Sequence, residues 1–253
     1  MRAFTVFTKK ELLESVRTYR FVIAIAVFVL MGILSPLTAL MLPRLIETMD
    51  LGDFQIILPE PTAMDAWAQF FSNVGTMGML VVIILFSGIM ANEFSRGTLV
   101  NLLTKGLNRT TVILSKFVAA SLVWTTVYLV CLGVTIGYVA FYWEVNLQNP
   151  VLAFVSLWLF GELLIAILIL GGTLFGSFGG SLALAGGMIV ILMLINIIPN
   201  MASYNPISLS GSTLTLLDGG QMAGDFIPAV MICGVAITTF MVLSIVVFWK
   251  KKI

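Results

Sequence analysis

Long apolar runs alternate with short polar segments along this chain. An apolar run of about 18 residues or more can cross the bilayer core as a helix. A membrane β-barrel would instead show segments of about ten residues with alternating polarity. The pattern therefore predicts an all-α membrane protein, with one transmembrane domain over residues 1–253. Its six expected spans are 21–41, 67–91, 117–142, 151–175, 181–199 and 227–248.

The segment before the first run, residues 1–20, has the pattern of an amphipathic helix. Thr8 and Glu11 have the spacing of a capping box, in which each side chain bonds the other residue's backbone N–H. One face of this helix carries the apolar residues Leu12, Leu13, Val16 and Tyr19. The other face carries the charged residues Lys9, Lys10, Glu14 and Arg17. Such a helix suits the lipid headgroup boundary, so we expect it to lie in the plane of the inner membrane surface. A basic tail that only directs topology is the alternative.

A polar segment of helical pattern, residues 92–116, separates the second and third spans. Its leucines recur on one helical face, at Leu99, Leu102, Leu103 and Leu107. Gly106 is suited to end this helix in the left-handed conformation, and Asn108 is suited to cap the next helix. The segment therefore predicts helix, turn and helix, with a leucine face beside a basic face. A solvated loop whose leucines lie on the bilayer is the alternative.

Lysine and arginine residues set the expected orientation. Of the 13 basic residues, only Arg44 falls on the side of the membrane opposite the 92–116 segment. Basic residues accumulate on the cytoplasmic side of membrane proteins. We therefore expect both termini and residues 92–116 to be cytoplasmic, and residues 200–226 to form an extracellular loop.

Composition excludes several classes of protein. With 60% hydrophobic and 10% charged residues, the chain has too little polar surface for a soluble globule. It has no histidine, the commonest metal ligand and general base, so no metal site or catalytic residue is expected. It also lacks the phosphate-loop motif Gly-x-x-x-x-Gly-Lys-Ser/Thr. We therefore expect no cofactor in this chain and no nucleic-acid partner. Cys131 and Cys233 fall inside expected spans and are expected to be core residues.

Glu162 is the ionisable residue near the middle of a span. A charge at that depth costs about 2.5–3.5 kcal/mol on insertion scales. We therefore expect Glu162 to be protonated, or hydrogen-bonded to a hydroxyl or amide on another helix, with Asn196 as one possible donor. It is a candidate for the translocation path or the dimer seam; a neutral, packed glutamic acid is the alternative.

Gly133 and Gly137 place two small residues at helical spacing in the third span. Small residues allow close approach between membrane helices. We expect packing within the chain at this position, and a dimer seam is the alternative.

The order of these elements resembles the transmembrane subunit of type-2 ATP-binding cassette exporters. In that family an in-plane elbow helix precedes six spans. The loop between spans two and three carries a coupling helix with an acidic residue, then Gly-Thr and a leucine-rich turn that ends near an arginine. The residues here that match or flank this pattern are Glu93, Arg96, Gly97, Thr98, Leu99, Leu102, Leu103, Lys105 and Arg109. Many members have a proline in the turn before the arginine, and this chain has Gly106, Leu107 and Asn108 there.

The resemblance implies a multi-pass permease subunit of the bacterial cytoplasmic membrane, without enzymatic activity of its own. Two permeases, either two copies of this chain or one copy and a homologue, would assemble with two cytoplasmic ATP-binding cassette subunits that hold ATP and Mg²⁺. The cargo implied is hydrophobic or amphipathic, namely a peptide, lipid or drug, and small bacterial members often export peptides or toxins. Two alternatives remain open: a scaffold or sensor that docks a partner through residues 93–107, and an intramembrane enzyme.

Overall fold

The computed structural model describes residues 2–48, 60–95, 97, 104, 106–144 and 147–251, without the side chains of residues 2 and 44–48. All regular secondary structure in these residues is helical. The helices of the first half are α1 (Arg2–Arg17), α2 (Arg20–Thr48), α3 (Ala63–Asn73), the π-helix η1 (Val74–Gly78), α4 (Met79–Phe86), α5 (Gly88–Ser95) and α7 (Arg109–Tyr142). Those of the second half are α8 (Pro150–Phe175), α9 (Phe178–Asn196), η2 (Ala202–Tyr204), α10 (Ser208–Gly211), α11 (Thr213–Leu217) and α12 (Ala223–Lys250).

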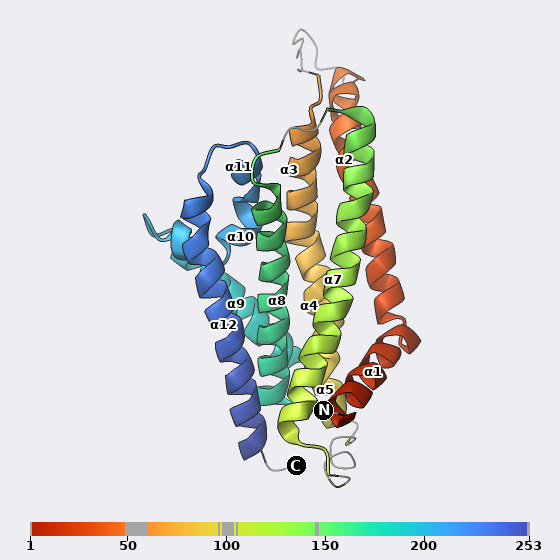
Figure 1. Cartoon of the computed structure of the whole chain (residues 1–253), viewed down its shortest axis with the longest axis vertical. Helices are drawn as coiled ribbons and strands as arrows, with labels where there is room; N and C mark the ends of the chain where they lie inside the picture. The colour runs from red at the N-terminus through yellow and green to blue at the C-terminus, as the bar shows by residue number, and fades with distance from the viewer. Residues whose placement is uncertain are drawn as a thin grey trace.

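Six helical segments in the described part of the chain are long and apolar enough to cross a membrane. They are α2, the continuous segment α3–η1–α4–α5, α7, α8, α9 and α12. The expected number of spans is therefore confirmed, and the chain is a multi-pass membrane protein. Figure 1 shows α1 inclined to the bundle and lying at the same end as the end of α12. We call this end, where α5 also ends and α7 begins, the α1 end.

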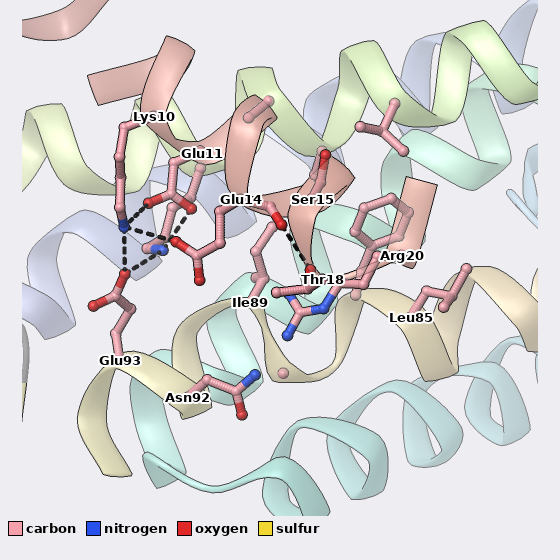
Figure 2. Close-up of a pocket in the computed structure, with 16 residues that line it drawn as sticks. Lys10, Glu11, Glu14, Ser15, Thr18, Arg20, Leu85, Ile89, Asn92 and Glu93 are labelled. Atoms are coloured by element: carbon pink, nitrogen blue, oxygen red, sulfur yellow. Dashed lines mark hydrogen bonds and ion pairs between the residues drawn. The ribbon is translucent and has the colours of Figure 1, made fainter. Parts of the chain in front are cut away.

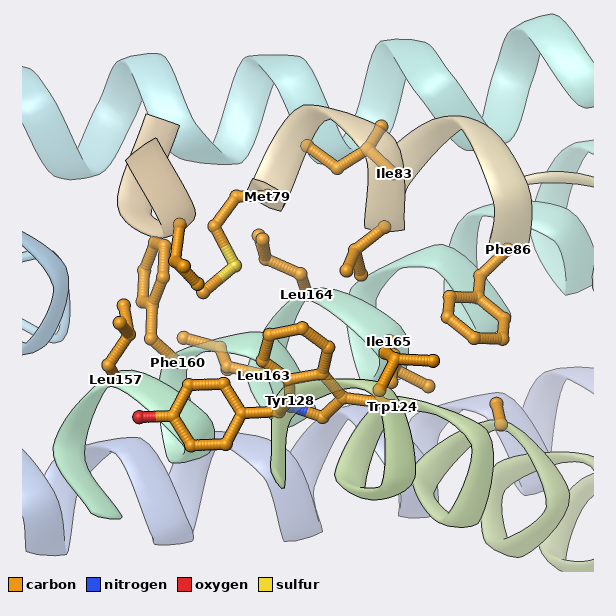
Figure 3. Close-up of a cluster of buried hydrophobic side chains, with 14 of the residues drawn as sticks. Met79, Ile83, Phe86, Trp124, Tyr128, Leu157, Phe160, Leu163, Leu164 and Ile165 are labelled. Atoms are coloured by element: carbon orange, nitrogen blue, oxygen red, sulfur yellow. The ribbon is translucent and has the colours of Figure 1, made fainter. Parts of the chain in front are cut away.

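The core is built around α8, which packs against α7, α9, α12 and the α4–α5 segment. Figure 3 shows Leu163 and Leu164 of α8 between Met79 of α4 and Trp124 of α7. By contrast, α9 and α12 leave most of their apolar surface exposed, as expected for helices that face lipid. The expectation that Cys131 and Cys233 are free core residues is also confirmed.

The seam between α7 and α8 combines close packing with hydrogen bonds to the backbone. A Cβ at Gly161 would lie 2.4 Å from the Trp124 ring, so only glycine allows the indole this position. The Trp124 Nε1–H donates to the carbonyl of Trp158 at 3.0 Å. One turn away, the Tyr128 hydroxyl donates to the carbonyl of Phe154 at 2.8 Å. These bonds satisfy the polar atoms of two aromatic side chains that are buried inside the bundle.

Pro36 lies inside α2, where its missing N–H leaves the carbonyl four residues earlier without a helical donor. That carbonyl belongs to Gly32, and the Thr135 hydroxyl of α7 shares its proton between it, at 3.2 Å, and the Cys131 carbonyl of α7, at 3.0 Å. Gly32 also permits the close approach, because a Cβ there would lie 2.8 Å from the Cys131 carbonyl oxygen. A neighbouring helix thus supplies the donor that proline removes.

The glycine pair of the third span, Gly133 and Gly137, differs from our expectation. Nothing lies within 4 Å of a Cβ built at Gly133 or Gly137, so these residues do not mediate packing within the described part of the chain. The expectation of intramolecular packing was therefore wrong. The two glycines lie on an open face of α7, because the contacts of this helix with α2 and α8 are made by other residues, such as Gly32 and Trp124.

Candidate functional site

The residues expected to form the coupling segment fall into three groups. Arg96, Thr98, Leu99, Leu102, Leu103 and Lys105 lie outside the described residues. Gly97 and Gly106 both adopt positive φ, at 63° and 85°. Glu93 and Arg109 belong to membrane-spanning segments, at the end of α5 and the start of α7. The connection between the two spans is therefore shorter than the expected 92–116, because α5 ends at Ser95 and α7 begins at Arg109.

Helix α7 begins as the sequence predicted. The Asn108 side chain accepts a hydrogen bond from the Thr110 backbone N–H at 3.0 Å and so caps the helix.

Two lysines and three glutamates meet at the α1 end, and we call them the lysine–glutamate cluster (Figure 2). Its members are Lys10, Glu11 and Glu14 of α1, Glu93 of α5 and Lys116 of α7. Lys116 Nζ lies 2.8 Å from Glu11 Oε2 and 3.2 Å from Glu93 Oε1. Lys10 Nζ lies 3.0 Å from Glu11 Oε1, 2.9 Å from Glu14 Oε2 and 3.1 Å from Glu93 Oε1. The cluster thus joins the N-terminal helix to both helices that flank the 92–116 segment.

The cluster is buried around Lys116, which is 1% exposed, and open around Lys10. Burying a charge is costly unless it is paired, and removing one partner of a buried pair costs about 3–5 kcal/mol. The ring of Phe7 lies 5.2 Å from Lys10 Nζ and 5.9 Å from Lys116 Nζ, which adds cation–π attraction. Burial alone would lower the pKa of Lys10. Its hydrogen bonds to Glu14 and Glu11 and the charges of Glu11 and Glu93 outweigh burial and raise that pKa above its ordinary value.

Carboxylate oxygens of Glu11, Glu14 and Glu93 lie within 4.8 Å of one another, which is close enough to bind a metal ion. However, Lys10 contacts all three carboxylates, and Lys116 contacts two of them. The ammonium groups therefore supply the positive charge that a metal would otherwise bring. The arrangement is that of a structural ion-pair network.

A second group of charges at the same end binds backbone carbonyls, and we call Arg109 and Lys251 the carbonyl-binding cluster. The Arg109 guanidinium donates to the carbonyls of Phe248, Trp249 and Lys251 at the end of α12. Lys251 Nζ donates to the carbonyls of Thr173 at 2.7 Å and Leu174 at 3.1 Å, at the end of α8. Cations at helix C-termini satisfy carbonyls that lack a helical donor and interact favourably with the helix dipole. Burial lowers the pKa of Lys251.

An aromatic pair links this cluster to α5. Phe94 follows Glu93 directly, and its ring meets the Phe248 ring edge to face at 6.0 Å. Lys251 Nζ lies 4.2 Å from the centre of the Phe94 ring. Neighbouring residues of α5 thus contact both clusters: Glu93 contacts Lys10 and Lys116, and Phe94 contacts α12.

Helix α1 differs in detail from the expected amphipathic helix. It begins at Arg2, so Thr8 is inside the helix and cannot cap it, and the Thr8 hydroxyl has no hydrogen-bond partner. The face that packs on the bundle carries Phe7, Thr8 and Glu11, with Leu12 partly buried beside them. Leu13 and Val16 are exposed, each at 47%. The expected cap at Thr8 was therefore wrong, and the face that packs on the bundle is partly polar because Glu11 pairs with Lys10 and Lys116.

Glu162 is 3% exposed and lies midway along α8. Its Oε1 accepts a hydrogen bond from the Ser121 hydroxyl of α7 at 2.6 Å, so the donor is Ser121 instead of Asn196. Its Oε2 is buried without a hydrogen-bond partner, and no described residue forms an ion pair with it. This carboxyl group thus forms a polar contact between α7 and α8 that is separate from the lysine–glutamate cluster.

Sequence reasoning missed Lys10, Lys116 and Lys251 as site residues. One signal was available for Lys116. An acid at the end of one span and a base in the first turns of the next lie at the same end of the bundle, so their side chains can meet. The role of Lys251 had no local signal, because its partners are backbone carbonyls of α8.

No family model matches this chain. The chain is similar to the uncharacterized transmembrane protein YxlG of Bacillus subtilis (strain 168), with 22% identity over 230 residues that cover 89% of each chain. The similarity extends over nearly the whole length of both proteins. The name of that relative agrees with the membrane-spanning helices described above.

Proposed function

We propose that this chain is the permease subunit of an ATP-driven exporter of the type-2 ATP-binding cassette kind. In this proposal α1 is the in-plane elbow helix, and the segment between α5 and α7 is the coupling element. A separate ATPase subunit binds ATP and Mg²⁺ and docks on that element. The cargo is hydrophobic or amphipathic and leaves the cell through a pair of permeases in the cytoplasmic membrane.

Charge supports placing the α1 end in the cytoplasm. The N-terminal helix, the 92–116 segment and the end of α12 carry almost all the basic residues of the chain. The exposed residues Leu13 and Val16 support an in-plane position for α1, because an exposed apolar side chain at the membrane boundary can lie among the acyl chains.

The observation that carries the proposal is the contact of Glu93 with both Lys10 and Lys116. A force applied to the loop between α5 and α7 reaches three helices through these ion pairs. Through Phe94 and Arg109 it also reaches the end of α12. A stiff connection of this kind is what a coupling element needs in order to convert the movement of an ATPase into a rearrangement of spans.

Glu93 and Arg109 have a different role in this proposal from the one expected from the sequence. Glu93 is 6% exposed, and Arg109 is bonded to the end of α12. We assign both to holding the ends of the coupling segment. Contact with the ATPase is then left to the residues between them: Arg96, Thr98, Leu99, Leu102, Leu103 and Lys105.

A second copy, or a homologue, fits the open face of α7. Gly133 and Gly137 lie there without neighbours in this chain, so a partner helix can approach them closely. This part of the proposal has its own test, which is cross-linking between cysteines introduced at residue 133 or 137 in membranes.

The proposal is tested by purifying the full chain from its native membranes in a mild detergent. We expect a protein with a phosphate-loop motif to copurify, and the complex to hydrolyse ATP faster when amphipathic peptides or lipids are added. Leu102→Asp places a charge in the leucine face of the coupling segment and should abolish both copurification and ATP hydrolysis. Met222→Asp is the matched control, because Met222 is 79% exposed at the opposite end of α12.

Two outcomes contradict the proposal. Recovery of the folded chain without any ATPase would exclude the exporter. A bound ATPase whose turnover no candidate cargo changes would instead favour the scaffold or sensor.

A further inference from the structure

A cavity of about 470 Å³ lies beside the lysine–glutamate cluster. It is bounded by α1, the start of α2, the α4–α5 segment and α7 (Figure 2). Ligand pockets in proteins commonly measure about 300–1,000 Å³, so this cavity is large enough to hold a small molecule or part of a larger one. Neither the ion pairs nor the proposed coupling accounts for this space.

Arg20 lines this cavity but does not belong to the lysine–glutamate cluster. It stands at the first residue of α2, and Figure 2 shows its side chain extending toward Ile89. Arg20 is half-buried, and its side chain forms no hydrogen bond or ion pair with any described residue. An arginine at the end of a membrane span normally directs its guanidinium to a phosphate or to water. The guanidinium matches a phosphate, to which it can donate two parallel hydrogen bonds.

The other polar wall of the cavity has an excess of hydrogen-bond acceptors. The cluster contains one more carboxylate than ammonium groups. Glu14 uses Oε2 for Lys10, while its Oε1 bonds no described residue. The side chain of Asn92 also lines the cavity without a hydrogen bond to the described residues. These groups suit a ligand ammonium that donates several N–H bonds.

The remaining walls are apolar and come from membrane spans. They are formed mainly by Leu85, Phe86, Ile89, Ala119, Ala120 and Val123. The cavity therefore has charged groups on the side of α1 and hydrocarbon on the side of the bilayer. A membrane lipid has the same arrangement, with a charged headgroup at one end and hydrocarbon chains at the other.

We propose that this cavity binds the headgroup of a phospholipid with a primary ammonium, of the phosphatidylethanolamine class. Arg20 binds the phosphate, Glu14 and Asn92 accept from the ammonium, and the first methylene groups of the acyl chains lie against Ile89 and Val123. This inference stands apart from the proposed function, because it depends only on the cavity and its charges.

The test uses the full chain in mild detergent after its native lipids have been removed. Phosphatidylethanolamine, phosphatidylcholine and phosphatidylglycerol are added back separately, and bound lipid is counted by native mass spectrometry. We expect phosphatidylethanolamine to bind about tenfold more tightly than the other two, because choline has no N–H and glycerol has no charge.

Two variants test recognition of the phosphate and recognition of the ammonium separately. Arg20→Gln should weaken all three lipids, whereas Glu14→Gln should remove the preference for phosphatidylethanolamine and leave the other two unchanged. Arg17→Gln is the matched control, since Arg17 is exposed on the last turn of α1 and should have no effect. The rise of the melting midpoint on adding lipid, taken relative to each variant without lipid, gives the same ranking even if a variant is less stable.

Three outcomes overturn the inference. One is equal binding of the three lipids by the wild-type chain. Another is unchanged preference in Glu14→Gln together with unchanged affinity in Arg20→Gln. The third is binding of Mn²⁺ that depends on Glu14 without any bound lipid, which would make the cavity a metal site.

Discussion

The cations of the two charged clusters at the α1 end have different kinds of partner. In the lysine–glutamate cluster, Lys116 is surrounded by carboxylates from two other helices. In the carbonyl-binding cluster, Arg109 and Lys251 donate to backbone carbonyls at the ends of α12 and α8. The cations of the first cluster bind side-chain carboxylates, whereas those of the second bind backbone carbonyls at helix ends.

This difference determines how much each cluster is destabilised when it loses a cation. A carboxylate that loses its lysine remains a buried charge, which is expensive. A carbonyl at a helix end that loses its arginine remains a neutral dipole near the membrane surface, which water can reach. We therefore expect the loss of a cation to lower the free energy of unfolding more in the lysine–glutamate cluster than in the carbonyl-binding cluster. The contacts of the carbonyl-binding cluster should also break more easily when the spans rearrange.

The largest effect is expected for Lys116→Met. This change leaves the carboxylates of Glu11 and Glu93 buried with only the partly exposed Lys10 beside them. We expect a loss of about 3–5 kcal/mol in the free energy of unfolding, measured by denaturant titration in detergent. Adding Glu11→Gln to Lys116→Met should restore part of this loss, because it removes one uncompensated charge. Equal stability of wild type and Lys116→Met would mean that the cluster does not stabilise the fold.

A smaller loss is expected for Arg109→Met. The hydrogen bonds from its guanidinium to the end of α12 are made by a charged donor, and such bonds contribute about 1.5–3 kcal/mol. Arg109→Lys should recover only part of the loss, because an ammonium sits on a shorter side chain and is more strongly hydrated than the guanidinium, whose Nη1 contacts all three carbonyls. Denaturation under the conditions used for Lys116→Met gives the comparison. A larger loss for Arg109→Met than for Lys116→Met would reverse our ranking of the two clusters.

The sequence predicted the spans because their apolar length is a local property. It also predicted the cap at Asn108, which depends on residues two apart. It did not predict that Thr8 and Glu11 face inward, because that depends on Lys116, more than 100 residues away along the chain. The helix pattern predicted an apolar face with Leu13 and Val16 at the membrane boundary, but it carried no information on which polar residues would pack on the bundle.

The same reasoning applies to Glu162. Its depth in the span followed from the hydropathy pattern, and a hydroxyl partner was among the expected solutions. The identity of Ser121 depended on how α7 packs on α8, which Gly161 and Trp124 set by close contact. No spacing within the sequence carries that information.

A still smaller effect on stability is expected at Glu162, because its single hydrogen bond is to a neutral hydroxyl. Such a bond contributes about 0.5–1.5 kcal/mol. Glu162→Gln keeps an acceptor for Ser121 and should be close to wild type in stability. Glu162→Leu removes the acceptor together with the unpartnered Oε2, so the two effects partly cancel. A transport assay of the two variants then distinguishes a role of the hydrogen bond from a role of the charge or proton. Full activity in Glu162→Gln with none in Glu162→Leu would assign the residue to the hydrogen bond, and loss in both would assign it to its charge or proton.

The smallest effect is expected for Lys10→Met, the exposed counterpart of Lys116→Met within the same cluster. The Lys10 side chain is 44% exposed, so its ion pairs contribute about 0–1 kcal/mol. The pKa of Lys10 is raised in the folded chain. The contribution of a lysine with a raised pKa is complete below the pKa of the unfolded chain, about 10.4, and is lost as the pH rises through the folded pKa. The stability difference between wild type and Lys10→Met should therefore stay constant from about pH 7 to 10 and fall above about pH 10.4. A difference that disappears between pH 7 and 9 would show that Lys10 loses its proton more readily than its neighbours allow, and would leave Lys116 as the cation that holds the cluster.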